Sequence, residues 1–201
     1  MKKLDISEFF LICSNMIPIF GVIFLGWSIT NVLLMYWAES GVIGVYSIIK
    51  TICAGRIVGI PISLFFIFHY GLFMMVHLAF IFVVTGNGLF FQSPLQGLVK
   101  YIDVIWFGVL SLFVSHGISF YQNYIKTGKY SQQSFQLAQR YTVEPYGRII
   151  LMHLTLIIGA FVAAIFKNSM YVLILFIILK IVVDLSAHRR QYHGTMRENI
   201  E

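Results

Sequence analysis

The stretch GIPISLFFIFHYGLFMMVHLAFIFVV, residues 59–84, decides the fold class of this chain. It contains no Asp, Glu, Lys or Arg, and its only ionisable groups of intermediate pKa are His69 and His77. About 20 consecutive apolar residues are enough for a helix to cross the hydrocarbon core of a bilayer. The stretch therefore predicts a transmembrane helix, with Pro61 in its first turn, where a missing N–H does little harm.

The composition of the whole chain extends this prediction. Of its 201 residues, 59% are hydrophobic and only 11% are charged, and the mean hydropathy is +0.84, which lies outside the range of soluble domains. We expect an all-α polytopic membrane protein, a bundle of six transmembrane helices in one domain, 1–201. The helices are predicted at about 8–25, 29–49, 59–84, 101–124, 145–166 and 170–188, with Ser28 or Thr30 capping the second.

The basic residues predict the orientation of this bundle. Six spans put both termini on one side, and most Lys and Arg residues fall on that side, whereas Lys100 and Lys167 fall opposite. By the positive-inside rule both termini are cytoplasmic, and we expect a multi-pass protein of the inner membrane. The net charge of +6 does not indicate nucleic acid, because the basic residues form no continuous soluble face. The terminal-side residues are Lys2, Lys3, Lys50, Arg56, Lys126, Lys129, Arg140, Arg148, Arg189, Arg190 and Arg197.

Two predicted loops are longer than turns, 88–100 on the outside and 126–141 on the inside. Both mix aromatic, apolar and polar residues, as segments that lie on a membrane surface do. We interpret them as tethers on the lipid surface. A lid over a site is the alternative.

Several ionisable side chains fall inside the predicted helices, where each costs about 2.5 to 3.5 kcal/mol unless it finds a partner. Counting 1.5 Å per residue from the cytoplasmic helix ends places most of them in one layer at depths of roughly 9 to 15 Å. We expect these groups to face one another rather than lipid. They are Glu39, His69, His77, His116, His153, Lys180, Asp184 and His188, of which His188 lies nearer the surface and His77 too far from His69 to share an ion with it.

The residue types of this layer suit a metal site. Imidazole nitrogens and carboxylate oxygens, without paired cysteines, are ligands for zinc or iron. The predicted ligands are His116, His153, Asp184 and His188, the last two spaced i, i+4 on one helix face. With Glu39 as general base, a metal-bound water would hydrolyse a lipid or another small membrane-resident substrate.

Other functions remain open for the same residues. Two histidines on facing helices, His69 with His116 or His116 with His153, would hold a haem in an electron carrier. Carboxylates and histidines also form proton or ion pathways. In a purely structural scaffold they would satisfy each other, with Glu39 or Asp184 paired to Lys180. Membrane lipids are the expected partners, a homo-oligomer is left open, and nucleic acid is not expected.

Two further residues receive structural interpretations. We expect His77 to be a satisfied histidine of the bundle interior. Arg148 lies one turn after Glu144 at a predicted cytoplasmic helix start, and we expect it to reach toward lipid phosphate.

Four segments in order resemble an uncharacterised family of prokaryotic integral membrane proteins, domain of unknown function 6498. They are LLMYWAESGVIGVYSIIK (33–50), FFIFHYGLFMMVH (65–77), VEPYGRIILMHLTLIIGAF (143–161) and KIVVDLSAH (180–188). The resemblance implies a six-helix membrane fold but no activity. It points to Glu39, His69, Arg148, His153, Asp184 and His188.

Overall fold

The computed structural model describes residues 17, 20–86, 94–150, 152–154 and 157–158. These residues are helical or lie in turns and short irregular connections, and none of them is in a strand. The chain divides into two compact units, Met1–Met152 and His153–Glu201. The described residues of the second unit, 153–154 and 157–158, are helical. The fold of the first unit is described below, and the single domain expected from the sequence stays a prediction.

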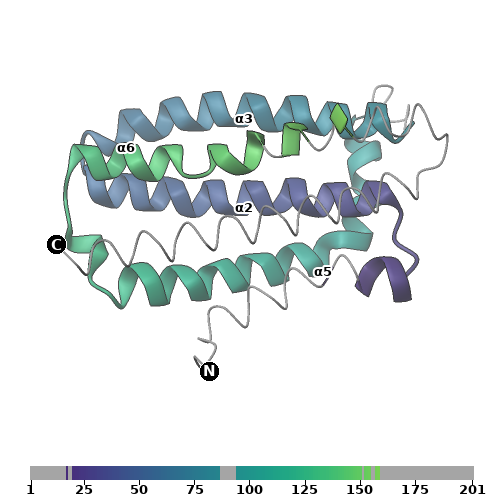
Figure 1. The fold of residues 1–201 in the computed structure, drawn as a ribbon, viewed down its shortest axis with the longest axis horizontal. Coiled ribbons are helices and arrows are strands. Elements are labelled where there is room, and N and C mark those ends of the chain that lie inside the picture. The colour runs from purple at the N-terminus through teal and green to yellow at the C-terminus, as the bar shows by residue number, and fades with distance from the viewer. Residues whose placement is uncertain (1–16, 18–19, 87–93, 151, 155–156, 159–201) are drawn as a thin grey trace. The chain divides into compact units, whose positions relative to one another are not determined.

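The described part of the first unit consists of α-helices with shorter helical segments between them (Figure 1). In chain order the elements are α2 (Ile29–Gly55), α3 (Gly59–Val84), α5 (Pro94–Phe120), the π-helix η1 (Tyr121–Ile125), the 3-10 helix η2 (Lys129–Ser131) and α6 (Phe135–Val143). Residues 20–24 and 146–150 are also helical.

The predicted boundaries agree well with α3 and less well with its neighbours. Helix α2 begins as expected, because the Ser28 hydroxyl accepts a hydrogen bond from the amide of Asn31 at 3.4 Å. It ends at Gly55 rather than at 49, because Lys50 does not break a helix, whereas Arg56 adopts a positive φ of 50° that does. Helix α5 begins at Pro94 rather than at 101. The predicted loop 88–100 is therefore partly helical.

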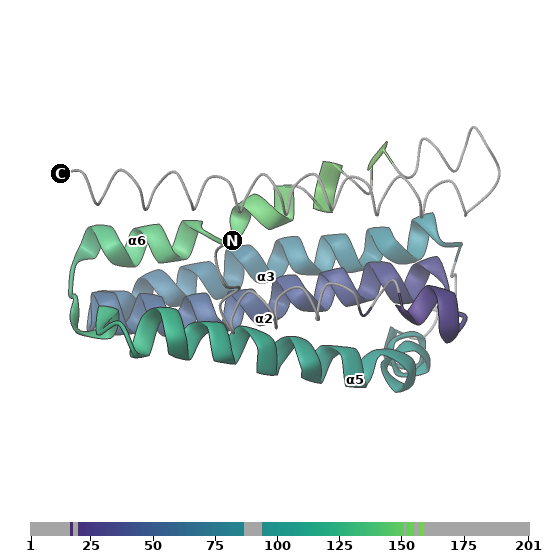
Figure 2. The ribbon, with the colours of Figure 1, turned by 60° about the horizontal axis from the view of Figure 1, so that its bottom comes forward.

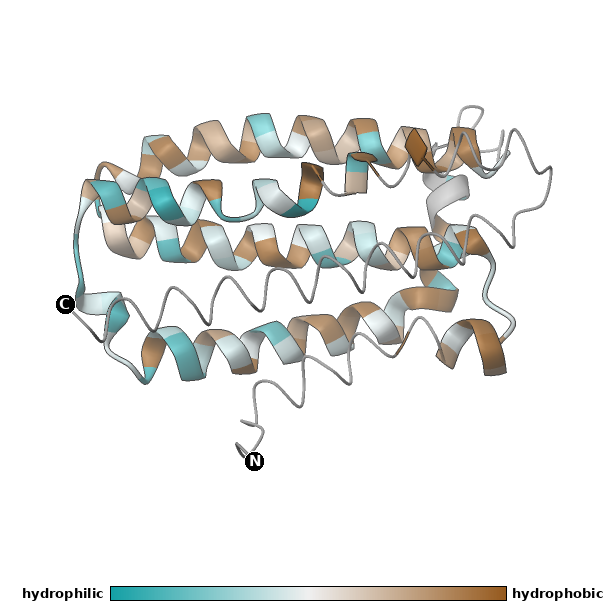
Figure 3. Cartoon of the chain, viewed as in Figure 1, coloured by the Kyte–Doolittle hydropathy of each residue, from teal (hydrophilic) through white to brown (hydrophobic). Residues whose placement is uncertain are grey.

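Three of the described helices are long and apolar enough to cross a membrane, namely Ile29–Gly55, Gly59–Val84 and Val99–Ile125. Helix α3 has large apolar side chains exposed along its outer side, among them Leu64, Phe65 and Phe68. Figure 3 shows the predominance of hydrophobic residues along this helix. Exposed apolar faces of this size are compatible with contact to lipid. The remaining predicted spans, 8–25, 145–166 and 170–188, lie wholly or partly outside the described residues.

Helix α2 is the centre of the first unit. It packs against α3, α5 and α6, and α6 also contacts α3 (Figures 1 and 2). The turn between α2 and α3 is tight, since a Cβ on Gly59 would lie 2.6 Å from the carbonyl oxygen of Thr51. On the other side of α2, a Cβ on Gly108 of α5 would meet the side chain of Met35 at 2.6 Å. Glycine at both positions allows the helices to approach closely.

Helix α6 runs antiparallel to α2 and lies alongside it. The amide of Ser134 donates to the Ala54 carbonyl at 3.1 Å. About two turns later in α6, the hydroxyl of Thr142 lies 3.1 Å from that of Thr51. The predicted loop 126–141 is therefore partly helical and packed against α2, and its interpretation as a tether on the lipid surface stays a prediction. The sequence of α6 is of mixed polarity because one side of the helix contacts the hydroxyl-bearing side of α2, whereas its other side is exposed.

The helical path from α6 into residues 146–150 is interrupted at Glu144 and Pro145. Pro145 has no N–H, so the Tyr141 carbonyl cannot receive the usual i→i−4 hydrogen bond. The hydroxyl of Ser47 on α2 donates to this carbonyl instead. Side-chain donors from neighbouring helices are one of the ways in which a proline break is tolerated at membrane depth.

Candidate functional site

A group of ionisable side chains lies at the middle of α2. The carboxylate of Glu39 is nearly inaccessible, with 4% of its side chain exposed. Its Oε1 accepts a hydrogen bond from Nη1 of Arg148 at 2.6 Å. The same oxygen lies 3.7 Å from Nε2 of His116 on α5. We call Glu39, Arg148 and His116 the Glu39 cluster.

The ion pair between Glu39 and Arg148 explains how a buried carboxylate is accommodated in an apolar helix. A buried carboxylate without a cation would lose several kcal/mol of hydration free energy. Such a group usually takes up a proton and becomes neutral instead. The guanidinium supplies a charge-assisted hydrogen bond. Arg148 is itself 34% exposed, so the desolvation cost falls mainly on Glu39. His116, with 14% of its side chain exposed, adds a second group next to the same oxygen that can carry positive charge.

Two hydrogen bonds between α2 and α3 hold the backbone around this cluster. Nε1 of Trp37 donates to the Met74 carbonyl at 2.8 Å, and the hydroxyl of Tyr70 donates to the Ser40 carbonyl at 2.9 Å. Trp37 and Ser40 flank Glu39 in the sequence, so both contacts fix the position from which the carboxylate projects. The apolar side chains beneath them form one packed group of Phe66, Tyr70, Met74 and Ile149 with Trp37, Ile48 and Tyr146 around it.

A second polar pair connects α3 with residues 146–150. Nδ1 of His69 is 2.8 Å from the hydroxyl of Tyr146, with the donor set by the histidine tautomer. The imidazole ring stacks on Phe65 at a centroid distance of 5.3 Å and meets the edge of Phe73 at 5.1 Å. Because Tyr146 and Arg148 are close in sequence, residues 146–150 connect the His69 pair on α3 with the Glu39 cluster on α2.

The structure brings together two of the site residues expected from the sequence, Glu39 and His116. His69 is in a separate pair with Tyr146. His153 belongs to the second unit, where it is helical, and Lys180, Asp184 and His188 lie outside the described residues. Within the part of the chain that is described, no three His, Cys, Asp or Glu side chains are grouped so that they could hold a metal ion. The four-ligand metal site and the roles assigned to Glu39 and His69 thus remain predictions.

The haem alternative gains no support from the helix arrangement. His69 is on α3 and His116 is on α5, and α2 packs against both of these helices (Figure 1). A bis-histidine clamp needs two helices that face each other across the haem. The second proposed pair, His116 with His153, involves both units.

His77 has the structural role expected for it. It is buried, and its Nδ1 lies 2.6 Å from the carbonyl oxygen of Phe73, one turn earlier in α3. Its polar group is satisfied within its own helix, as buried polar groups usually are.

Arg148 is the functional candidate whose surroundings were predicted wrongly. The expectation of a lipid-phosphate anchor assumed that the helix begins at Pro145 on the membrane surface. In the structure the helix α6 precedes Pro145, and Arg148 lies beside the middle of α2, where it pairs with Glu39. Two signals pointed this way: an acid in an apolar helix requires a cation, and the resemblance named Glu39 and Arg148 together.

Three of the four segments that carry the family resemblance meet in space, and the fourth, 180–188, lies outside the described residues. The YWAE segment of α2 provides Glu39, the HYG segment of α3 provides His69 and Tyr70, and the EPYGR segment provides Tyr146 and Arg148, which contact the first two. Residues 2–200 match a family described as "Family of unknown function (DUF6498)". No curated protein and no solved structure matches the chain.

Proposed function

The chain belongs to this family of unknown function, DUF6498, and we propose that it is a six-helix inner-membrane protein in which the Glu39 cluster forms part of a proton or ion pathway. Both termini would lie in the cytoplasm. The apolar helices α2 and α3 and the span Val99–Ile125 support the membrane part of the proposal.

The contact of one carboxylate oxygen of Glu39 with both Arg148 and His116 carries the proposal. Glu39 lies on α2 eleven residues from Lys50, a distance of about 16 Å along a helix. If Lys50 marks the cytoplasmic boundary, the cluster lies near the middle of the bilayer. Ionisable groups at this depth are costly and typically belong to ion pathways or proton relays.

The interrupted helix supports the same interpretation. In many transporters the substrate and coupling-ion sites lie near the bilayer midplane, where a spanning helix is discontinuous. Here α6 and residues 146–150 are separated by Glu144 and Pro145, and Arg148 follows the break by one turn. Arg148, in the segment after the break, thus pairs with Glu39 of α2.

The cluster has the groups required to hold and release a proton. The guanidinium of Arg148 stays charged and holds the Glu39 carboxylate in place. A proton that reaches Glu39 weakens this ion pair, and His116 is placed to accept or supply that proton through a small side-chain movement or one water.

Proton flux into liposomes tests the proposal. The purified full-length protein is reconstituted with an internal pH-sensitive dye, and a potassium diffusion potential drives protons inward. Wild-type vesicles should acidify faster than protein-free vesicles, and Glu39→Gln should return the rate to that of protein-free vesicles. Glu144→Gln is the matched control, because Glu144 is half exposed and pairs with Lys50 away from the cluster. Equal rates for wild type and Glu39→Gln would exclude the pathway.

A metal-dependent hydrolase is the second candidate, favoured by the 3.7 Å approach of His116 to Glu39. In it, His116, His153, Asp184 and His188 would hold zinc or iron, with Glu39 as the base. Metal analysis of purified protein tests this function. Stoichiometric metal that is lost in His153→Ala and Asp184→Ala would support it, and metal retained in both variants would refute the ligand set.

The proposed orientation can be measured independently of activity. A fluorescent protein fused to the C-terminus should fluoresce, whereas alkaline phosphatase fused at the same place should be inactive, because that enzyme matures only outside the cytoplasm. The reverse pattern would contradict the orientation.

A further inference from the structure

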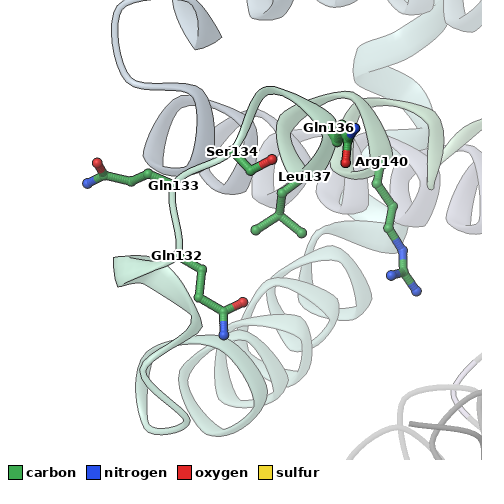
Figure 4. A pocket seen from close by; sticks show the side chains of 6 residues that line it. All are labelled: Gln132, Gln133, Ser134, Gln136, Leu137 and Arg140. Carbon is green, nitrogen blue, oxygen red and sulfur yellow. The ribbon is translucent and has the colours of Figure 1, made fainter. Parts of the chain in front are cut away.

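Arg140 of α6 lines two adjacent hollows on the first unit. The first, of about 550 Å³, lies at the start of α6 and is lined by Gln132, Gln133, Ser134, Gln136, Leu137 and Arg140 (Figure 4). The second, of about 650 Å³, lies between α3 and α6 and is lined by Pro61, Ile62, Phe65, Gln139, Arg140, Thr142 and Val143. We call them the polar hollow and the apolar groove. Both are open surface hollows, so a ligand bound in them would stay partly exposed.

The two hollows divide polar from apolar surface along α6. Glutamine side chains and Ser134 line the polar hollow together with Arg140, and in Figure 4 the Arg140 guanidinium lies at one end of it while Gln133 points away at the other. In the apolar groove, Val143 follows Arg140 by one turn and faces Ile62 and Phe65 of α3. The exposed guanidinium of Arg140 thus lies at the boundary between a polar and an apolar surface.

The charge of Arg140 is not neutralised by the described part of the chain. Arg140 is exposed, and the ion pairs found among the described residues involve Lys50, His116 and Arg148 instead. Its guanidinium can donate two parallel hydrogen bonds to a phosphate, which is the geometry in which arginine binds phosphates best.

The apolar groove is continuous with a surface that belongs in lipid. Phe65 lines the groove and is exposed on α3, next to the exposed Leu64 and Phe68. Helix α3 is the most apolar of the candidate spans, with a hydropathy of 2.1. A lipid acyl chain can therefore enter the groove sideways from the membrane, whereas a soluble anion would leave the groove empty.

We propose that the polar hollow and the apolar groove together bind one phospholipid with an anionic head group. Its phosphate pairs with Arg140, the amide groups of Gln132 and Gln136 donate to head-group oxygens, and one acyl chain packs against Ile62 and Phe65. Arg140 lies at the end of the bundle for which the sequence predicts the cytoplasmic side, and basic groups at that surface attract anionic lipids. This site is separate from the Glu39 cluster; it rests on the membrane location and orientation in the proposed function but not on the proton or ion pathway.

Lipid binding to the detergent-purified full-length protein tests the proposal, measured by native mass spectrometry with phosphatidylglycerol and phosphatidylcholine of the same acyl chains. Wild type should bind phosphatidylglycerol about tenfold more tightly, because the choline ammonium of phosphatidylcholine offsets the attraction between its phosphate and Arg140. Arg140→Gln should lose this preference and Arg140→Lys should keep part of it. Lys129→Gln, which removes an exposed charge outside both hollows, should keep it in full.

A second arm separates a lipid from a free anion. Ile62→Trp fills the apolar groove and should weaken phosphatidylglycerol binding while leaving the fold intact, because Ile62 is partly exposed. Inorganic phosphate at millimolar concentration should not displace the lipid. Displacement by phosphate, or unchanged binding in Ile62→Trp, would overturn the proposed lipid site in favour of a simple anion site. Unchanged preference in Arg140→Gln would overturn the site altogether.

Discussion

The ion pair between Glu39 and Arg148 predicts a strong energetic coupling between two positions far apart in the sequence. The perturbation is a double-mutant cycle of Glu39→Met, Arg148→Met and the double variant. Arg148→Met leaves a carboxylate of which only 4% is exposed without its guanidinium. Removing one partner of a fully buried pair costs about 3 to 5 kcal/mol. Because Arg148 is 34% exposed and polar contacts within membranes are often weaker, we expect a cost of about 2 to 4 kcal/mol.

The reverse change should cost less. Glu39→Met leaves a guanidinium that is already partly exposed and can turn toward water or lipid head groups, so a loss of about 1 to 2 kcal/mol is expected. In the double variant no charge remains buried without a partner. Its stability should therefore exceed the value expected from adding the single losses by about 2 kcal/mol.

The assay is reversible unfolding in mixed micelles, in which the unfolding free energy is extrapolated from a titration with a denaturing detergent. Lys50→Met and Glu144→Met form the control cycle, because their side chains lie 3.6 Å apart but are 24% and 51% exposed. The control coupling should stay below about 1 kcal/mol. A coupling of less than about 0.5 kcal/mol between Glu39 and Arg148 would refute the reasoning, because it would mean that the carboxylate does not depend on the guanidinium.

Two further outcomes test the packing by the same unfolding measurement. Ser47→Ala should lower the unfolding free energy by about 1 to 2 kcal/mol, because the Tyr141 carbonyl loses its donor. In a Pro145→Ala background the loss should be small, because a backbone N–H becomes available. An equal loss in both backgrounds would contradict this account of the helix break. Gly59→Ala should cost more than about 2 kcal/mol, because its Cβ would lie 2.6 Å from a backbone oxygen of α2, whereas Gly71→Ala meets nothing within 4 Å and should be neutral or stabilising. Equal stability of the two alanine variants would show that the turn is not tight.

Local pattern was a good guide to α2 and α3. The uninterrupted apolar run of 59–84 has the same limits as α3, and Ser28 caps α2 as its position predicted. Both features depend on neighbouring residues only, namely on hydropathy over about 20 residues and on one side-chain hydrogen bond. The end of α2 was missed, because a single lysine resembles a membrane boundary but does not end a helix.

By itself, the sequence determined that Glu39 needs a partner and that apolar helices would form, since both follow from the cost of leaving polar groups in hydrocarbon. It could not identify the partner, because Lys180, His116 and Arg148 were all available to a chain of unknown packing. The pairing depended on α6 lying along α2. The mixed polarity of residues 126–141 did not indicate this packing. The hydrogen bond from Ser47 to the Tyr141 carbonyl allows the packing despite the missing N–H of Pro145. Only the tertiary structure decides such pairings, because Glu39 and Arg148 are 109 residues apart and meet through the packing of α2 against the segment that follows α6.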